Sequence, residues 1–417
     1  MSQNFFRSSI GFGALASVVF VAACSVDRSV TGPTITPAAA GSVSQTVSQD
    51  TVKRYIVRLK EAPGGVAATA SALTQPYGGK LAHIFEHVFQ GFVVQGISSD
   101  AAAALASSPL VDYVEQEGFS YPTDVQSLVY GSQWGLDWID QRTPPVDWQY
   151  SYTYSGAGVH IYIVDSGVRG GHVEFTGRMG NGACKLSFSS GCSPTIDQNG
   201  HGTAVASQAA GTTAGVAKQA TIHPVRIDDA GGGAYDGDII AGLDWVLGNH
   251  INPSVVNLSY GDDGTCGCGG SFAQRDALQR LADNGIIVVK SAGNANRDAY
   301  MWRPNRVNPG LVVAAAGWDG TSTLYRMSYS SYGSTVDLYA PGNGTLAATN
   351  SANDAYRHDF GGTSGASPFV AGVAAQILQA NPSFSPSQVE STVKAIATPG
   401  VISGTMPGDP NLFLFRY

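Results

Sequence analysis

The chain has few charged residues and no excess of positive ones. Only 13% of its 417 residues are charged, and 23 Lys and Arg stand against 31 Asp and Glu, which gives a net charge of −8. Nucleic-acid-binding proteins usually carry a basic face, and no Lys/Arg cluster appears here. The composition therefore argues against a nucleic-acid partner. Low charge combined with 52 Gly and 43% hydrophobic residues is typical of a compact protein rather than a disordered one.

The N-terminal region lacks a hydrophobic run long enough to cross a bilayer. Residues 10–23 are apolar and follow Arg7, but a membrane span needs about 20 residues, so the run is typical of a signal peptide. It ends in Val-Ala-Ala before Cys24, which resembles the bacterial lipobox, where the cysteine is lipidated. The alternative is ordinary signal cleavage after Ala23, with Cys24 unmodified.

From this N-terminus we expect an exported protein. Residues 1–23 are predicted to be a signal peptide of the lipoprotein type, and residues 24–51, rich in Ser, Thr, Val, Pro and Ala, a flexible linker. The precursor would be anchored to the cell envelope through a lipid on Cys24, with no other membrane contact. The mature protein would be extracellular if maturation separates it from Cys24.

Cysteine is scarce. Apart from Cys24 there are four cysteines, at positions Cys184, Cys192, Cys266 and Cys268. In an exported chain an even set predicts disulfides, and four cysteines allow three connectivities. We expect Cys184–Cys192 and a tight Cys266–Cys268 bridge. A zinc site is the alternative, but no His lies at ligand spacing from either pair.

The pattern of hydrophobic residues predicts two folded parts. Residues 52–121 contain strand patterns at 53–59, 87–94 and 111–115 and helix patterns at 67–75 and 101–106, which suggests a small α+β domain of the order β-α-β-β-α-β, with one strand uncertain. A polar, unpatterned stretch follows. From residue 134 onward, strands and helices alternate, which predicts an α/β domain with a parallel sheet and helices on both faces.

Four polar residues stand at the ends of predicted strands or the starts of predicted helices. They are Asp165, His201, Asn294 and Ser364. In parallel sheets, active residues gather at the carboxyl ends of the strands. A serine at a helix start gains from the free N–H groups there, and a histidine titrates in the range needed for proton transfer. Taken singly, each also fits a turn or a helix cap.

The motifs around these residues resemble those of the subtilase family of serine proteases, and within it the proteinase K and aqualysin-like branch. They are residues 163–167 (Ile-Val-Asp-Ser-Gly), 201–203 (His-Gly-Thr) and 362–368 (Gly-Thr-Ser-Gly-Ala-Ser-Pro). Their order is the one known for subtilisin. The resemblance implies a subtilisin-like fold and peptide-bond hydrolysis without a cofactor. Its catalytic residues would be Ser364 as nucleophile, His201 as base, Asp165 to orient it, and Asn294 for the oxyanion.

The same resemblance implies further features of a monomeric protease. Polypeptide substrates would bind as a strand between two walls, with an apolar or aromatic side chain favoured before the scissile bond; the walls are Gly231 and Gly233 on one side and Ser259, Tyr260 and Gly261 on the other. Residues 52–121 would be an inhibitor prodomain, cut away near Gln126–Ser127 to leave a peptidase domain at 127–417. A structural calcium ion would be bound by Asp337, with backbone oxygens near Pro309 and Leu311.

The sequence departs from the family pattern at three places. Ala204 stands where a second His is usual, Ser207 where Gly is usual, and Gly365 where Met is frequent. Two other functions are alternatives to a protease. A non-catalytic peptide-binding lipoprotein would be expected to have lost one of the four polar residues. An α/β-hydrolase esterase needs Gly-x-Ser-x-Gly and the reverse order of the triad.

Overall fold

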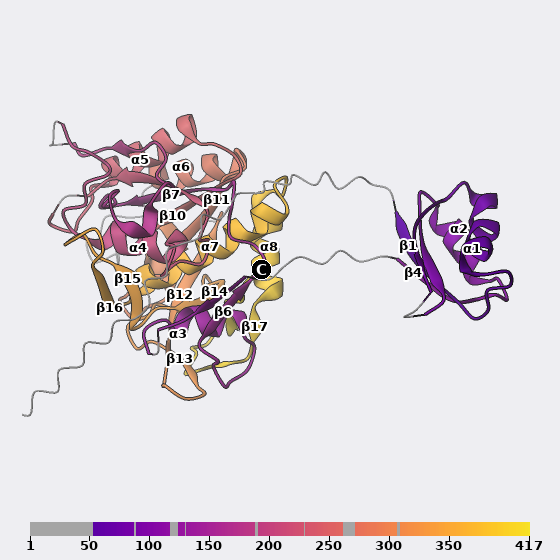
Figure 1. The fold of residues 1–417 in the computed structure, drawn as a ribbon. Coiled ribbons are helices and arrows are strands. Elements are labelled where there is room, and N and C mark those ends of the chain that lie inside the picture. Colours follow the sequence, from indigo (N-terminus) through magenta and orange to yellow (C-terminus); the bar gives the residue numbers. More distant parts are fainter. Residues whose placement is uncertain are drawn as a thin grey trace, which may run out of the picture. The chain divides into compact units, whose positions relative to one another are not determined.

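The computed structural model describes residues 53–86, 89–116, 124–129, 131–187, 191–228, 230–261, 272–306 and 309–417. The chain divides into two compact units, with the boundary between Phe119 and Ser120 (Figure 1). None of the helices among the described residues is long and apolar enough to cross a membrane. The predicted signal peptide and linker, with Cys24, lie outside the described residues, as do Cys266 and Cys268.

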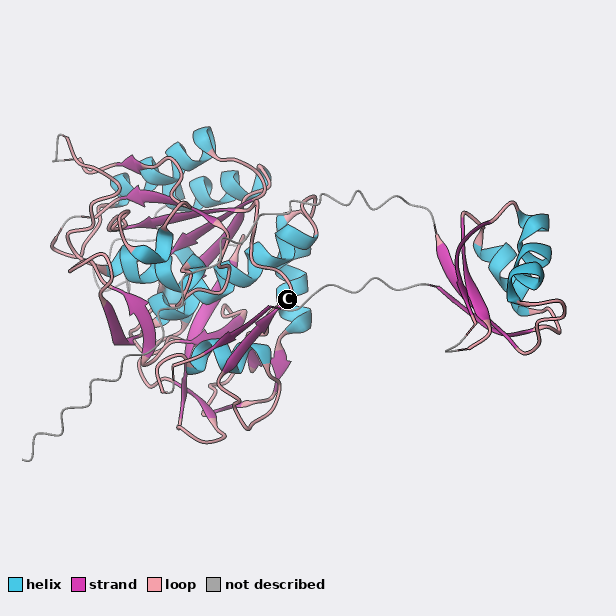
Figure 2. Cartoon of the chain, viewed as in Figure 1, coloured by secondary structure: helices cyan, strands magenta, loops and turns pink. Residues whose placement is uncertain are grey.

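The first unit is a four-stranded antiparallel sheet with two helices. Its elements are β1 (Arg54–Leu59), α1 (Val66–Thr74), a 3-10 turn (Gln75–Tyr77), β2 (Lys80–Phe85), β3 (Gly91–Gln95), α2 (Ser99–Ala106) and β4 (Val111–Gln116). The strand order is β2-β3-β1-β4, that of a ferredoxin-like sheet, and both helices lie on one face (Figure 2). β1 alternates as predicted and buries Tyr55, Val57 and Leu59. β2 was the uncertain strand, since none of its side chains is buried and its sequence shows no alternation.

The second unit is built on a sheet with the order β17-β19-β14-β12-β11-β10-β7-β9-β8. From β8 to β19 every neighbouring pair is parallel. The strands are β7 (His160–Asp165), β8 (Ala183–Cys184), β9 (Thr221–Arg226), β10 (Ser254–Leu258), β11 (Ile287–Ser291), β12 (Leu311–Trp318), β14 (Leu338–Pro341), β17 (Thr398–Pro399) and β19 (Leu412–Phe413). The parallel sheet predicted from the sequence is confirmed.

Helices cover both faces of this sheet, because successive residues of each strand point to opposite sides. Ile161 and Ile163 of β7 pack with the helices α4 (His201–Ala210) and α7 (Thr363–Ala380). Tyr162 and Val164 pack with α5 (Asp236–Asn249) and α6 (Phe272–Asp283) instead. The remaining helices are α3 (Trp134–Asp140) and α8 (Pro386–Ile396), with 3-10 turns at Val173–Phe175, Ala299–Met301 and Arg303–Asn305. The continuous apolar runs of the central strands follow from this double burial.

Short strands complete the second unit. β15 (Thr345–Ala348) and β16 (Tyr356–Phe360) form an antiparallel hairpin that leads into α7, and β5 (Asp124–Ser127) pairs with β6 (Gln149–Tyr152). β13 (Leu324–Arg326) and β18 (Ile402–Ser403) extend the main sheet from β12. None of these strands was expected from the hydrophobic pattern. Their pairing is set by contacts with distant segments, which a local pattern does not reveal.

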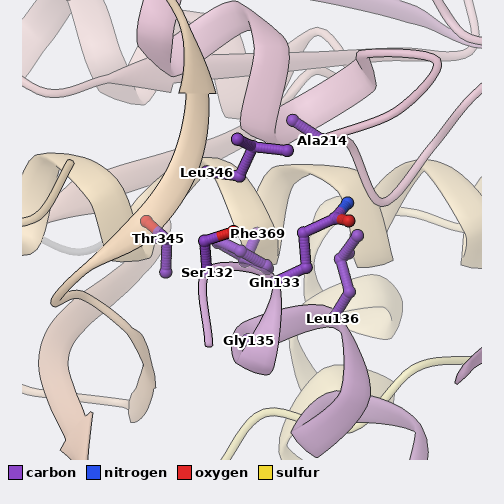
Figure 3. A pocket seen from close by; sticks show the side chains of 8 residues that line it. All are labelled: Ser132, Gln133, Gly135, Leu136, Ala214, Thr345, Leu346 and Phe369. Carbon is purple, nitrogen blue, oxygen red and sulfur yellow. The ribbon is translucent and has the colours of Figure 1, made fainter. Parts of the chain in front are cut away.

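The stretch around Trp134 is packed beneath the segment that carries Ser364. Trp134 Nε1 donates to the carbonyl of Asn343 (2.9 Å), and the Leu346 amide donates to the carbonyl of Ser132 (2.7 Å). Figure 3 shows the side chains that meet between α3, β15 and α7. The gap among them has a cavity volume of about 0 Å³, so no water fits. The start of the second unit thus packs against α7, the helix that carries Ser364.

The disulfide expected between Cys184 and Cys192 is present, with Cα atoms 5.9 Å apart. It closes a small loop that follows β8 at the edge of the main sheet.

Candidate active site

Asp165 and His201 come together at the carboxyl end of β7. Asp165 is the last residue of the strand and fully buried, and His201 is the first residue of α4. His201 Nδ1 lies 2.8 Å from Asp165 Oδ1. The glycines around His201 permit this approach: a Cβ on Gly202 would lie 2.1 Å from the carbonyl oxygen of Gly167.

A second buried carboxylate, Asp197, orders the loop that carries His201. Its Oδ2 accepts hydrogen bonds from the amide (2.9 Å) and hydroxyl (2.6 Å) of Thr203, and its Oδ1 accepts one from the Gly200 amide (2.7 Å). The Ser166 hydroxyl donates to Asp197 Oδ1 (2.9 Å) and accepts from the Gly202 amide (2.9 Å). Asp197 and Ser166 therefore fix α4 against the end of β7.

The surroundings of His201 favour its protonated form. Burial lowers the pKa of His201, but the charge of Asp165, the hydrogen bond with it, and the charges of Asp197 and Asp228 together raise the pKa above its ordinary value. Because an ionised carboxylate can only accept, the neutral ring carries its proton on Nδ1 and leaves Nε2 as the base. The side chain of His201 is 26% exposed, so the base faces solvent while its partner does not.

Ser364 lies in the first turn of α7 and is 9% exposed. α7 begins at Thr363, so Ser364 is part of the helix itself. In the first turn of a helix, the backbone N–H groups have no intrahelical partner and the dipole is positive. The Ser364 hydroxyl donates to the carbonyl of Ser259 (3.4 Å), and the structure shows no hydrogen bond between Ser364 and His201. In ligand-free enzymes such bonds often form only when substrate binds.

Asn294 is held with its amide N–H₂ group outward. Its Oδ1 accepts from the Thr363 amide (2.8 Å) and the Thr363 hydroxyl (3.0 Å), which fixes the orientation of the side chain. A Cβ atom added to Gly362 would lie 3.4 Å from Asn294 Nδ2 and 3.6 Å from the Ser364 amide nitrogen. Two hydrogen-bond donors therefore flank the same small space beside Ser364.

The predicted cleft walls lie in different environments. The Tyr260 ring packs edge-on against His201 (5.7 Å between centroids), and its hydroxyl donates to Asp228 Oδ2 (2.6 Å). A Cβ on Gly261 would lie 2.3 Å from Trp302 Nε1, so this wall needs glycine. Gly231 and Gly233, in contrast, are exposed in an irregular loop and not in a strand.

Comparisons with known proteins agree with this geometry. A model described as the subtilase family matches residues 156–412. The chain belongs to the subtilase family. It is 40% identical over 353 residues to an extracellular serine proteinase of Thermus sp. (strain Rt41A), which covers 85% of this chain and 82% of the relative. It is 32% identical over 331 residues to proteinase R of Parengyodontium album (78% and 79%).

A solved structure of a cold adapted subtilisin-like serine proteinase is similar to this subtilase in fold. Its TM-score is 0.62 at 36% sequence identity, and the match covers 70% of this chain and 99% of the other. The α/β domain of this subtilase therefore has the subtilisin-like fold, and the protein is a subtilisin-like serine endopeptidase.

Asp337, the carboxylate predicted to bind calcium in this subtilase, has two other hydrogen-bond partners in this structure. Asp337 Oδ1 accepts from Lys394 Nζ (3.1 Å) and Asp337 Oδ2 from the Val312 amide (2.9 Å). The Lys394 ammonium group therefore lies beside this carboxylate. The calcium site, with backbone oxygens near Pro309 and Leu311, stays a prediction. The described part of the chain contains no group of three or more His, Cys, Asp or Glu that could hold a metal. The peptide hydrolysis proposed for this subtilase does not use a metal ion.

Three residues of this subtilase's site were not identified from the sequence. Asp197 and Ser166 fix the His201 loop, and Thr363 orients Asn294. The position of Thr363 directly before Ser364 is the one sequence feature that points to it. Nothing in the sequence indicates that Thr363 contacts Asn294.

Proposed function

We propose that this subtilase hydrolyses peptide bonds through an acyl-enzyme on Ser364. The observation that carries the proposal is the 2.8 Å contact between His201 Nδ1 and the buried Asp165, which leaves Nε2 free as a base. Ser364 Oγ attacks the substrate carbonyl while His201 Nε2 takes its proton. His201 then gives that proton to the leaving amine, and a water molecule, deprotonated by His201, releases the acyl group.

The negative charge on the carbonyl oxygen is stabilised by two donors, the Asn294 amide and the Ser364 backbone N–H. Both flank the space beside Gly362. Each such donor typically contributes about 3–4 kcal/mol to the transition state. Asp165 stabilises the imidazolium that forms on His201, in line with the raised pKa of His201.

The acyl half of a polypeptide substrate binds along Ser259, Tyr260 and Gly261, opposite the Gly231–Gly233 loop. Main-chain hydrogen bonds to such an edge bind a peptide with little regard to sequence. The apolar sheet end and the Tyr260 ring favour apolar or aromatic side chains before the scissile bond.

The protein is made as an exported, self-processing zymogen. Relatives of this subtilase are described as extracellular proteinases, and subtilases generally carry an inhibitory prodomain. Residues 52–121 are the inhibitory prodomain of this chain. The cut near Gln126–Ser127 separates the peptidase domain from a lipid on Cys24. Since these two residues belong to β5, which pairs with β6, β5 must leave β6 before that bond is cut.

The test compares the whole precursor with its Ser364→Ala form. We expect the wild type to shorten to a product starting near Ser127 and to cleave peptides, while the variant stays full-length and inactive. N-terminal sequencing of the product locates the cut. If both forms stay full-length and inactive under oxidising, calcium-containing conditions, the proposal is wrong, and a non-catalytic peptide-binding role becomes the hypothesis to test.

A further inference from the structure

A hollow of about 510 Å³ opens beside His201, a size typical of ligand sites. One wall is formed by Asn199, Gly200 and His201 at the start of α4. The other wall is formed by the β15–β16 hairpin, with Asn350 in its turn and Arg357 and Asp359 in β16. Figure 1 shows this hairpin next to α4.

The hollow is separate from the walls assigned to the acyl half of the substrate. It includes no residue of Ser259–Gly261 or of the Gly231–Gly233 loop. Asn199 marks the border, since a Cβ on Gly232 would lie 3.1 Å from its Nδ2. His201 lines the hollow and must also protonate the leaving amine. The leaving half of the substrate therefore begins at the residue that borders this hollow.

The hairpin wall is fixed relative to His201. Asn350 Nδ2 donates to the carbonyl of Asp197 (3.0 Å), the residue that also orders the His201 loop. Arg169 donates to the carbonyl of Asn350 (2.8 Å) and to Asn353 Oδ1 (2.7 Å). These hydrogen bonds hold the turn of the hairpin against Arg169 and the His201 loop. The shape of the hollow is therefore fixed by these contacts.

Arg357 is the cation of this wall, and it is held in a defined orientation. Its Nε donates to Asp359 Oδ1 (2.8 Å), and its guanidinium lies over the Phe360 ring at 5.6 Å. The Phe360 ring in turn packs against His201 (5.8 Å between centroids). Among the described residues, hydrogen bonds of Arg357 use Nε alone. The two Nη groups therefore remain available as a planar fork, which matches a carboxylate.

The two charges of the pair are not equivalent. The Arg357 side chain is 46% exposed and that of Asp359 77%. The hydrogen bond from Arg357 and its charge lower the pKa of Asp359, so both groups are charged near neutral pH. Water screens the more exposed carboxylate more strongly. A charged side chain in the hollow is therefore expected to interact more with Arg357 than with Asp359.

We propose that this hollow binds the first residues of the leaving half of the substrate, and that Arg357 selects an acidic side chain there. The inference rests on the acyl-enzyme mechanism proposed above. It adds a specificity on the leaving side that does not depend on the side chain before the scissile bond.

Acyl transfer to added amines measures binding on the leaving side of the site while the acyl half stays the same. The active enzyme, made from the full chain, is acylated with an apolar amino-acid ester, and aspartic acid α-amide or lysine amide is added as a competing nucleophile. The amine nitrogen attacks the Ser364 ester and its proton passes through His201 to Ser364 Oγ, which leaves a peptide and free enzyme. The ratio of the two amide products reports binding in the hollow, because the acyl half is the same.

We expect the wild type to favour the aspartic amide by about threefold, the size typical of a partly exposed ion pair. Arg357→Gln should bring the ratio close to one, and Arg357→Glu should reverse it. Arg275→Gln is the matched control, since Arg275 forms an ion pair with Asp276 of similar exposure on α6 (47% and 67%). Its ratio should equal that of the wild type.

An unchanged ratio in both Arg357 variants overturns the inference while leaving the mechanism intact. A wild type that forms no acyl-enzyme with the ester refutes the mechanism instead, so the two failures are distinguishable. The preference should also fall towards one at 1 M salt, because salt screens an exposed charge pair; a preference insensitive to salt contradicts a role for Arg357.

Discussion

At the residue scale, the site depends on partners that fix each functional side chain. Thr363 is an example: its amide and hydroxyl both donate to Asn294 Oδ1, and its hydroxyl accepts from the Gly293 amide (3.0 Å). A threonine next to the nucleophile would otherwise look like a simple helix cap. Its contacts instead fix the orientation of the Asn294 amide, whose N–H₂ group is proposed above to stabilise the oxyanion.

Replacing Thr363 by Val should lower kcat by about tenfold, because a buried donor to Asn294 and a buried acceptor for Gly293 are lost. KM should change little, since the Thr363 side chain is fully buried. Thr363→Ser, which keeps the hydroxyl, should restore most of the rate. Steady-state kinetics on a peptide amide decide between the two causes. A loss of rate in Thr363→Ser but not in Thr363→Val would show that the shape of the side chain matters and its hydroxyl does not.

The raised pKa of His201 predicts the acidic limb of the pH profile. His201 must be neutral to act as a base, so kcat/KM should rise with pH through an apparent pKa above the ordinary value of about 6.5. Removing a nearby negative charge lowers that pKa. Asp228→Asn should therefore move the limb to lower pH; an unmoved or alkaline-shifted limb would contradict the assigned cause.

At the element scale, α4 is placed by the close approach of its first turn to β7. A Cβ on Gly202 would lie 2.1 Å from the Gly167 carbonyl oxygen and 3.0 Å from Asp165 Oδ1. The helix and the strand can meet at this distance only because no side chain intervenes. The Asp165–His201 contact is thus a consequence of how two elements pack.

Gly202→Ala should destabilise the protein by about 1–3 kcal/mol, as overpacking in a tight core does. The measurement is thermal unfolding in a Ser364→Ala background, where self-cleavage cannot interfere. Gly248→Ala in α5 is the control, since nothing lies within 4 Å of a Cβ there and alanine favours a helix. It should be neutral or stabilising; equal effects at both positions would argue against the steric account.

At the scale of the whole molecule, buried carboxylates near the start of the second unit make stability depend on pH. Burial raises the pKa of Asp137 to about 6 and that of Asp140 to about 7. The folded state therefore holds these protons more tightly than the unfolded chain does. Their contribution to stability is fully present below the ordinary carboxyl pKa of about 4 and is lost as pH rises through about 6 and about 7.

Asp140→Asn should remove part of this loss. Measured at pH 8 with a chelator present, the variant's free energy of unfolding should exceed that of the wild type by on the order of 1–2 kcal/mol, allowing for solvent screening. Below about pH 4 the two should be similar, because Asp140 is then protonated in both the folded and the unfolded state. A variant that is less stable at pH 8 would show that the carboxylate has a stabilising partner there.

Much of the fold follows from local pattern. Asp165, His201 and Ser364 stand in short motifs because turns, helix starts and close backbone approach restrict nearby residues strongly. The central strands could be predicted from their continuous apolar runs, since both faces are buried. β2 and the β15–β16 hairpin could not, because their partners lie elsewhere in the chain and their own residues show no clear alternation.

The sequence by itself determined the residue types of the site and the alternation of strands and helices, since these depend on neighbours along the chain. Only the tertiary structure decided which side chains meet. It placed Lys394 against the carboxylate expected to bind calcium, tied Asn294 to Thr363, and set Arg357 beside His201. Contacts of this kind join residues far apart in sequence, and their geometry is fixed by how whole elements pack.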